Sequence, residues 1–205
     1  MSKKFTVLAI LFCVCLIASN LFETKIFTAG IITLTGGFVL FPVSYILNDC
    51  ISEVYGYRKA KFVIWTAFAM NAFFVLSAQL VRVLPGAPFW DGQEHFDCIF
   101  TANFRITVAS MLAFLTGSIM NAKVMSRMKG RDGGQRFGLR AVLSSLVGES
   151  IDSLVFFPIA FFGVGLRNLV LMMLAQIFLK TLYEVVLLPV TSRFVKYLKA
   201  HEKNV

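Results

Sequence analysis

Residues 147–158 read VGESIDSLVFFP and lie inside an apolar run, from about Leu139 to Gly163, that is long enough to span a bilayer. Glu149 and Asp152 stand three residues apart in this stretch, so a helix places both carboxylates on one face. A charge at the bilayer centre costs about 2.5–3.5 kcal/mol on insertion scales, so the pair needs a compensating partner. The stretch therefore predicts a polar cavity, a transported ligand or an ion path. The alternative is a pair of acids neutralised by basic side chains of neighbouring helices, serving assembly alone.

The composition is typical of a membrane protein and not of a soluble domain. Hydrophobic residues make up 58% of the 205 residues, and the mean hydropathy is +0.76. The charged residues gather in a few short stretches, which predicts one membrane domain over residues 1–205. A net charge of +9 is compatible with nucleic-acid binding. The positions of Lys and Arg fit membrane topology instead, so we expect the lipid bilayer, and no nucleic acid, as a partner.

The hydropathy pattern predicts an all-α integral membrane protein with six transmembrane helices. The expected spans are about Phe5–Phe22, Gly30–Leu47, Phe62–Val83, Thr101–Ala122, Leu139–Gly163 and Leu169–Ser192. With six spans, the basic stretches at 3–4, 58–61 and 123–140 and the basic tail fall on one side, and the acidic 84–100 loop falls on the other. The positive-inside rule then places both termini in the cytoplasm. The first span is expected to be retained as a helix and not removed as a signal peptide.

The middle span of each half carries a carboxylate pair and a proline. A 3+3 inverted repeat, with a site at its interface, is therefore a candidate arrangement. Asp49 and Glu53 are four residues apart and share a helical face with Tyr45, one turn earlier. These acids are expected near the cytoplasmic end of the second span. For Glu53, the alternative is a solvated helix end paired with Arg58 or Lys59.

Two further ionisable residues, Lys180 and Glu184, lie well inside the sixth span and are also four residues apart. One interpretation is an ion pair within the helix. The other is that Lys180 answers Glu149 or Asp152 across the bundle. Phe156 follows these acids by about one turn, where a flat ligand could stack on its ring.

Several signatures of enzymes and metal sites are missing. The sequence has no Walker A motif, so the chain hydrolyses no ATP itself. It has no HExxH and no GxSxG, and both histidines, His95 and His201, lie outside the expected spans. The four cysteines show neither CxxC nor a zinc-like spacing. We therefore expect neither an enzyme, nor a cofactor, nor a bound metal.

Residues 41–60 read FPVSYILNDCISEVYGYRKA. This stretch resembles the signature F-P-x-x-Y-x-x-x-D-x-x-x-E-x-Y-G-Y-x-x-A of the queuosine precursor transporter family, also called the vitamin uptake transporter family. Residues 148–153, GESIDS, with Phe156 and residues 160–161, look like the second motif of that family. Asn20 with Lys25, and Lys180 with Glu184 and Pro189, match weaker positions. The resemblance covers nearly the whole chain, and Asn48, where many relatives are apolar or Thr, is a soft departure.

The resemblance implies uptake of 7-cyano-7-deazaguanine (preQ0), and of 7-aminomethyl-7-deazaguanine (preQ1) as a second substrate, across a bacterial inner membrane for tRNA queuosine salvage. A carboxylate can accept the adjacent N1–H and N2–H donors of such a base in a bidentate pair. The residues expected at the substrate are Glu149, Asp152, Asn20, Lys180, Tyr45 and Phe156. Those expected in coupling or gating are Asp49, Glu53, Glu184 and Lys25.

A secondary transporter acting without an ATPase is the leading prediction, and a homodimer is a plausible assembly for so small a transporter. One alternative is the substrate-binding subunit of an energy-coupling-factor system, which docks an ATPase module through small residues on early helices. The first span shows no clear AxxxA motif for such docking. The alternative from another class is an intramembrane enzyme or a structural membrane protein.

Overall fold

The computed structural model describes residues 2–29, 32–101, 104–133, 135–163 and 165–201. Its helices are α1 (Lys3–Phe22), α2 (Phe41–Tyr55), α3 (Tyr57–Arg82), α4 (Gln93–Thr101), α5 (Phe104–Asp132), α6 (Phe137–Ala160) and α7 (Leu166–His201). Two short strands, β1 (Ile26–Ala29) and β2 (Ile32–Thr35), and the 3-10 turn η1 (Gly36–Val39) link α1 to α2. Within the described residues, six helical stretches are long and apolar enough to cross a membrane. The predicted six-span helical architecture is confirmed.

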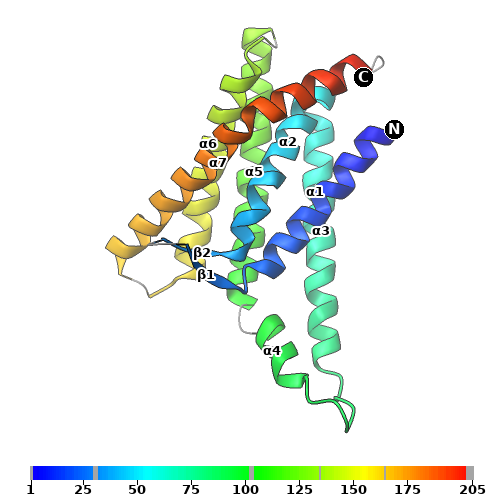
Figure 1. The fold of residues 1–205 in the computed structure, drawn as a ribbon, viewed down its shortest axis with the longest axis vertical. Helices are drawn as coiled ribbons and strands as arrows, with labels where there is room; N and C mark the ends of the chain where they lie inside the picture. The colour runs from blue at the N-terminus through cyan, green and yellow to red at the C-terminus, as the bar shows by residue number, and fades with distance from the viewer. Residues whose placement is uncertain (1, 30–31, 102–103, 134, 164, 202–205) are drawn as a thin grey trace.

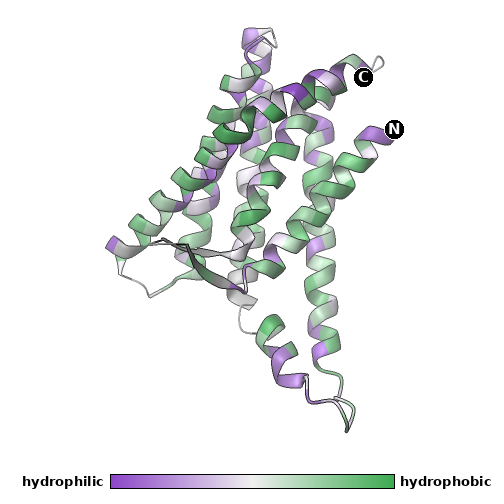
Figure 2. Ribbon diagram, in the orientation of Figure 1, coloured by the Kyte–Doolittle hydropathy of each residue, from purple (hydrophilic) through white to green (hydrophobic). Residues whose placement is uncertain are grey.

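The arrangement of the helices agrees with the predicted topology. In Figure 1 the two termini lie at one end of the bundle, together with the α2–α3 turn at Gly56 and the α5–α6 connection. We call this the basic end, because the basic stretches of the sequence gather there. The opposite, acidic end carries the loop 83–92 and α4. Figure 2 shows hydrophobic residues along most of α1, α3 and α7, with hydrophilic residues at the helix ends and on α4.

The second span differs from its prediction of about Gly30–Leu47. In its place, β1 and β2 pair as antiparallel strands, in which Ile26 lies opposite Thr35. The β-branched Ile and Thr of this segment favour strands over helix. After η1, α2 begins at Phe41 with Pro42 in its first turn, where the missing N–H of proline costs nothing. The helix then continues past Leu47 to Tyr55, because its carboxylates find partners inside the bundle.

Two smaller differences concern a predicted loop and the end of the last predicted span. The loop expected over 84–100 contains the helix α4, and α7 extends to His201 instead of ending near Ser192. α2 ends at Gly56, whose φ of +85° lies in the left-handed region that glycine adopts without strain. The sharp turn at Gly56 starts α3 immediately.

The buried face of α1 explains how the first helix docks. Phe5, Leu8, Phe12 and Leu16 recur at helical spacing and form one buried stripe against α2 and α3. The other residues of α1 include many large exposed apolar side chains, such as Val7. Such a surface suits contact with lipid.

A glycine contact brings α5 and α6 into the closest helix packing of the bundle. A Cβ placed on Gly117 of α5 would lie 2.8 Å from the Gly148 carbonyl oxygen, and one placed on Gly148 of α6 would lie 3.0 Å from the Gly117 carbonyl oxygen. Small residues allow this close approach of membrane helices. The ring of Tyr45 from α2 lies over the contact, with Cε1 3.0 Å from the same Gly148 position. The glycines therefore position α2 against α5 and α6, where the candidate site lies.

Candidate transport site

Three residues on one face of α2 mark a buried polar path. Tyr45, Asp49 and Glu53 follow one another at one-turn intervals and are all buried, with Asp49 and Glu53 at 0% exposure. The rise of an α-helix spreads them over about 12 Å. Each meets a different group of side chains from α5, α6 and α7. The path runs from the bundle interior to the basic end.

The innermost group, which we call the central cluster, consists of Glu149, Asp152, Lys180 and Tyr45. Lys180 Nζ of α7 lies 3.0 Å from Glu149 Oε2 and 3.3 Å from Asp152 Oδ2, both on α6. All three side chains are buried. The structure therefore shows Lys180 bound across the bundle to the two acids, and not to Glu184 within its own helix. The ring centroid of Phe41 lies 5.1 Å from Nζ.

The Tyr45 hydroxyl is buried in this cluster without a hydrogen-bond partner among the described residues. A Cβ on Gly117 would lie 2.5 Å from Tyr45 Oη and 3.0 Å from Asp152 Cβ, so the hydroxyl is close to Asp152. A buried polar group left unsatisfied costs about 1–3 kcal/mol. An unpaired hydroxyl beside an ion pair is what a site for a polar ligand requires.

One turn closer to the basic end lies the acid pair, Asp49 and Glu184. Asn121 Nδ2 donates to Asp49 Oδ1 at 2.9 Å, and Ser145 Oγ donates to Asp49 Oδ2 at 3.5 Å. Glu184 of α7 interacts with both Asp49 and Ser145. No ion pair within the described residues involves Asp49 or Glu184. Two carboxyl groups thus face each other here without a cation between them.

The basic-end network consists of Glu53, Asp132, Arg140 and Lys199. Arg140 Nη2 lies 2.7 Å from Glu53 Oε2, with both side chains at 0% exposure, and its Nη1 lies 2.6 Å from Asp132 Oδ2. Lys199 of α7 also pairs with Glu53. Glu53 is therefore not the solvated helix end that would pair with Arg58 or Lys59. The network ties α2, α5, α6 and α7 together.

Three of the sequence-predicted residues lie elsewhere. Phe156 packs against Phe157, with ring centroids 5.3 Å apart, in an aromatic cluster of α6. Lys25 has an exposed side chain just after α1. Asn20 accepts a hydrogen bond from Ser110 Oγ of α5 at 2.5 Å and faces a separate pocket. Within the described part of the chain, the Lys25 side chain forms no ion pair, so its role in gating stays a prediction.

Glu23 directly follows the first predicted span and is not among the residues predicted at the site. The structure places it beside Gly37, where an added Cβ would meet Glu23 Cγ at 2.5 Å. Burial raises the pKa of Glu23 to about 8, against the attraction of Lys180, and the negative charge of Asp152 raises it further. Glu23 therefore borders the central cluster at the C-terminal end of α1. Its spacing of three residues from Asn20 was the available signal.

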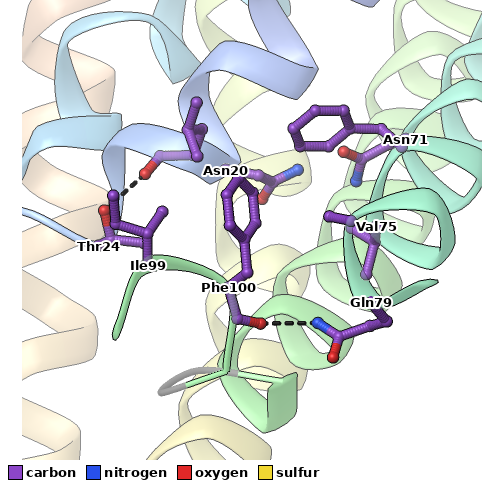
Figure 3. Close-up of a pocket in the computed structure, with 10 residues that line it drawn as sticks. Asn20, Thr24, Asn71, Val75, Gln79, Ile99 and Phe100 are labelled. Atoms are coloured by element: carbon purple, nitrogen blue, oxygen red, sulfur yellow. Dashed lines mark hydrogen bonds between the residues drawn. The ribbon is translucent and has the colours of Figure 1, made fainter. Parts of the chain in front are cut away.

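A further pocket, the outer pocket, lies between α1, α3 and α4 toward the acidic end. Its principal residues are Asn20, Asn71, Phe74, Gln79, Ile99 and Phe100. Figure 3 shows the amides of Asn20 and Asn71 entering it from α1 and α3, with the Phe100 ring from α4 between these helices. Gln79 Nε2 donates to the Phe100 carbonyl oxygen at 2.7 Å.

Neither site has the ligand set of a metal centre. Across the described residues, no group of three or more His, Cys, Asp or Glu side chains lies close enough to hold a metal ion. The central cluster presents two carboxylates and one ammonium group, which can form hydrogen bonds to a ligand.

The chain is similar to known membrane transport proteins. The family model described as "Putative vitamin uptake transporter" matches residues 35–194. The "Queuosine precursor transporter" of Escherichia coli is 30% identical over 130 residues, which are 62% of this chain and 55% of the relative. The "Probable queuosine precursor transporter" of Bacillus subtilis is 25% identical over 149 residues, 72% of this chain and 65% of the relative. The matched part of this chain thus covers slightly more than half of the length of one relative and about two thirds of the length of the other. No solved structure matches it.

Proposed function

The chain belongs to the vitamin uptake transporter family, and from this premise we propose that it takes up 7-deazaguanine precursors of queuosine across a bacterial inner membrane as a secondary transporter. The family is one of transporters and not of enzymes. The names of the relatives in Escherichia coli and Bacillus subtilis support the substrate class. The single observation that carries the proposal is the buried lysine held between two carboxylates of the neighbouring helix.

The groups of the central cluster match the edge of a 7-deazaguanine base. The base presents N1–H and N2–H as adjacent donors and O6 as an acceptor. Glu149 or Asp152 can accept both donors in a bidentate pair, and Lys180 can donate to O6. The base then forms hydrogen bonds with the same charged groups that bond to one another when no base is bound. A ligand can therefore take over hydrogen bonds of the ion pair, while the opposite charges of Lys180 and the two acids stay within the same cluster.

Aromatic and hydroxyl groups complete the proposed site. Tyr45 supplies an unpaired buried hydroxyl close to Asp152. Phe41, whose ring lies beside Lys180, is better placed to stack on a base than Phe156, which packs against Phe157. We therefore assign base stacking to Phe41.

The acid pair is our candidate for the coupling proton. Two adjacent carboxylates cannot both be ionised without a large repulsion, so a pair of this kind holds a shared proton. Asp49 and Glu184 are one turn from the central cluster on α2 and α7. Release of the proton from this pair can therefore be linked to the state of Lys180. Glu53, in the basic-end network, is assigned to closing the path toward the cytoplasm.

The test is uptake of labelled preQ0 into proteoliposomes that hold only this protein, with a proton gradient imposed or withheld. We expect gradient-driven uptake that falls at least about tenfold in Glu149→Gln, since a hydrogen bond to a charged group contributes about 1.5–3 kcal/mol. The matched control is Glu94→Gln, on the exposed surface of α4. Binding without uptake would indicate a subunit that awaits an ATPase module. The absence of both would exclude this substrate.

A further inference from the structure

The outer pocket contains buried amide groups that the fold does not explain. Asn71, in the middle of α3, is 1% exposed, and neither its Oδ1 nor its Nδ2 has a hydrogen-bond partner among the described residues. Asn20 is 9% exposed, and its Nδ2 is also unpaired. Each unsatisfied buried group costs about 1–3 kcal/mol, and an apolar side chain at Asn71 would avoid that cost. A ligand that forms hydrogen bonds with these amides would satisfy the unpaired groups.

We propose that the outer pocket is a second base-binding site, which captures the 7-deazaguanine before it reaches the central cluster. The inference rests on the proposed function and deepens it. An asparagine amide offers one acceptor and one pair of donors, which complements the N1–H donor and O6 acceptor of the base. Asn20 Nδ2 adds a second donor on the opposite helix.

Aromatic side chains give the pocket its affinity for a flat ligand. The rings of Phe74 and Phe100 form an edge-to-face pair with centroids 6.3 Å apart. Stacking of a base on an aromatic side chain contributes about 1–3 kcal/mol. Among the described residues that line the pocket, none is ionisable. The outer site therefore binds the neutral base by stacking and hydrogen bonds, whereas the central cluster binds it through charges.

The size of the pocket indicates how the base enters. The space between the lining side chains is about 390 Å³ when its open mouth is included, but the interior as it stands admits only water-sized groups. A base therefore needs the Phe100 ring to turn aside. Phe100 is carried by α4, which packs mainly against α3 and is linked to it by the Gln79 hydrogen bond. A small movement of this nine-residue helix opens the site.

The position of the pocket fits a stage before the central cluster. Asn20 is bonded to Ser110 of α5, and Gly117, which contacts Tyr45 of the central cluster, lies two turns further along the same helix. Seven residues of helix correspond to about 10 Å. A base can therefore pass from the outer site to the central cluster along one face of α5.

The experiment measures binding stoichiometry with labelled preQ0 on the purified full chain in lipid nanodiscs. We expect two bases per chain for the wild type, one for Asn71→Leu, one for Glu149→Gln and none for the double variant. Met70→Leu, at an exposed neighbouring position of α3, is the matched control and should bind two. Asn71→Leu should also keep or raise the unfolding temperature, because it removes an unpaired buried amide. A purely structural asparagine would instead lose stability when replaced.

The outcomes separate this inference from the proposed function. One base per chain, lost in Glu149→Gln and unaffected by Asn71→Leu, overturns the outer site and leaves the proposed function intact. One base that depends on Asn71 and not on Glu149 supports the outer site and overturns the central one. No binding to the wild type overturns both. In transport assays, loss of the outer site should raise KM about tenfold or more and leave kcat unchanged.

Discussion

The central cluster and the basic-end network share three helices, α2, α6 and α7, yet their charges are balanced differently. At the basic end, Glu53 and Asp132 meet Arg140 and Lys199. In the interior, Lys180 is the only cation paired with Glu149 and Asp152 among the described residues. Glu23 borders this cluster as a further acid, and the acid pair lies one turn away.

This difference in charge balance suggests different roles for the two regions. The basic-end network suits a structural ion pair, and the central cluster suits a site whose groups exchange partners. Two acids, Glu53 and Asp132, balance two cations, Arg140 and Lys199, so removal of Arg140 or Glu53 leaves the remaining charges unequal. The interior holds more carboxyl groups than cations, so it must take up protons or the donor groups of a ligand. A balanced network suits a closure that holds helices together. An unbalanced one suits a transport site.

Breaking the balance at the basic end should give the largest effect on stability. Arg140→Met leaves Glu53 buried with only Lys199, and loss of one partner of a buried pair costs about 3–5 kcal/mol. We expect that loss in reversible unfolding of the protein in mixed micelles. Arg131→Met, at an exposed position of α5, should change little. The double variant Glu53→Gln, Arg140→Met should recover part of the loss, and equal losses in the single and double variants would contradict the proposed balance.

The same substitution type should have opposite consequences in the two regions. Glu149→Gln removes one acid from the interior excess, so it should leave the unfolding free energy unchanged or higher, while preQ0 binding weakens about 10–100-fold. Glu53→Gln leaves Arg140 without its buried carboxylate, so it should lose stability. Isothermal titration and unfolding of both variants, in one lipid composition, make the comparison. A similar stability loss in both would mean that the interior is a structural ion pair after all.

The ionisable pairs were predictable because they depend on local spacing. Asp49 with Glu53, and Glu149 with Asp152, share helical faces in any α-helix. Partner choice was not predictable, because it depends on how the helices pack. Arg140 was assigned to a basic loop by its neighbours in sequence, although it is fully buried. The end of α2 was placed too early for the same reason, since acids read as a solvated helix end when their partners on other helices are unknown.

The uncharged polar residues show where sequence reasoning stops. An asparagine within an apolar span commonly bonds to a neighbouring helix, as Asn121 does with Asp49. Asn71 has the same sequence context but has no partner within the described residues. The sequence did contain a local indication of the strands β1 and β2, because β-branched residues, which favour strands, lie on both sides of Gly30. That signal was outweighed by the hydropathy of the segment.

The contact between Gly117 and Gly148 also shapes the central cluster, because it holds Tyr45 of that cluster against α5 and α6. A Cβ on Gly148 would meet Asn121 Cβ at 2.9 Å and Tyr45 Cε1 at 3.0 Å, so Gly148→Ala must displace one of them. Overpacking of this kind costs about 1–3 kcal/mol. Gly130 of α5 has no atom within 4 Å of such a Cβ. Gly130→Ala should therefore stabilise the helix by about 0.5–1 kcal/mol, and unfolding measurements that fail to separate the two variants would exclude the contact.

A last expected effect is a pH dependence that comes from the acid bordering the interior excess. Burial raises the pKa of Glu23 from its ordinary value of 4.5 to about 8. The native protein then holds a proton that the unfolded chain releases between these pH values, so stability falls as the pH rises from about 4.5 and levels off above about 8. Glu23→Gln should flatten this part of the curve of unfolding temperature against pH, while the exposed control Glu94→Gln keeps the wild-type slope. If the wild type and Glu23→Gln fall in parallel, Glu23 is outside the charge excess, and the acids of α2, α6 and α7 alone make the interior differ from the basic end.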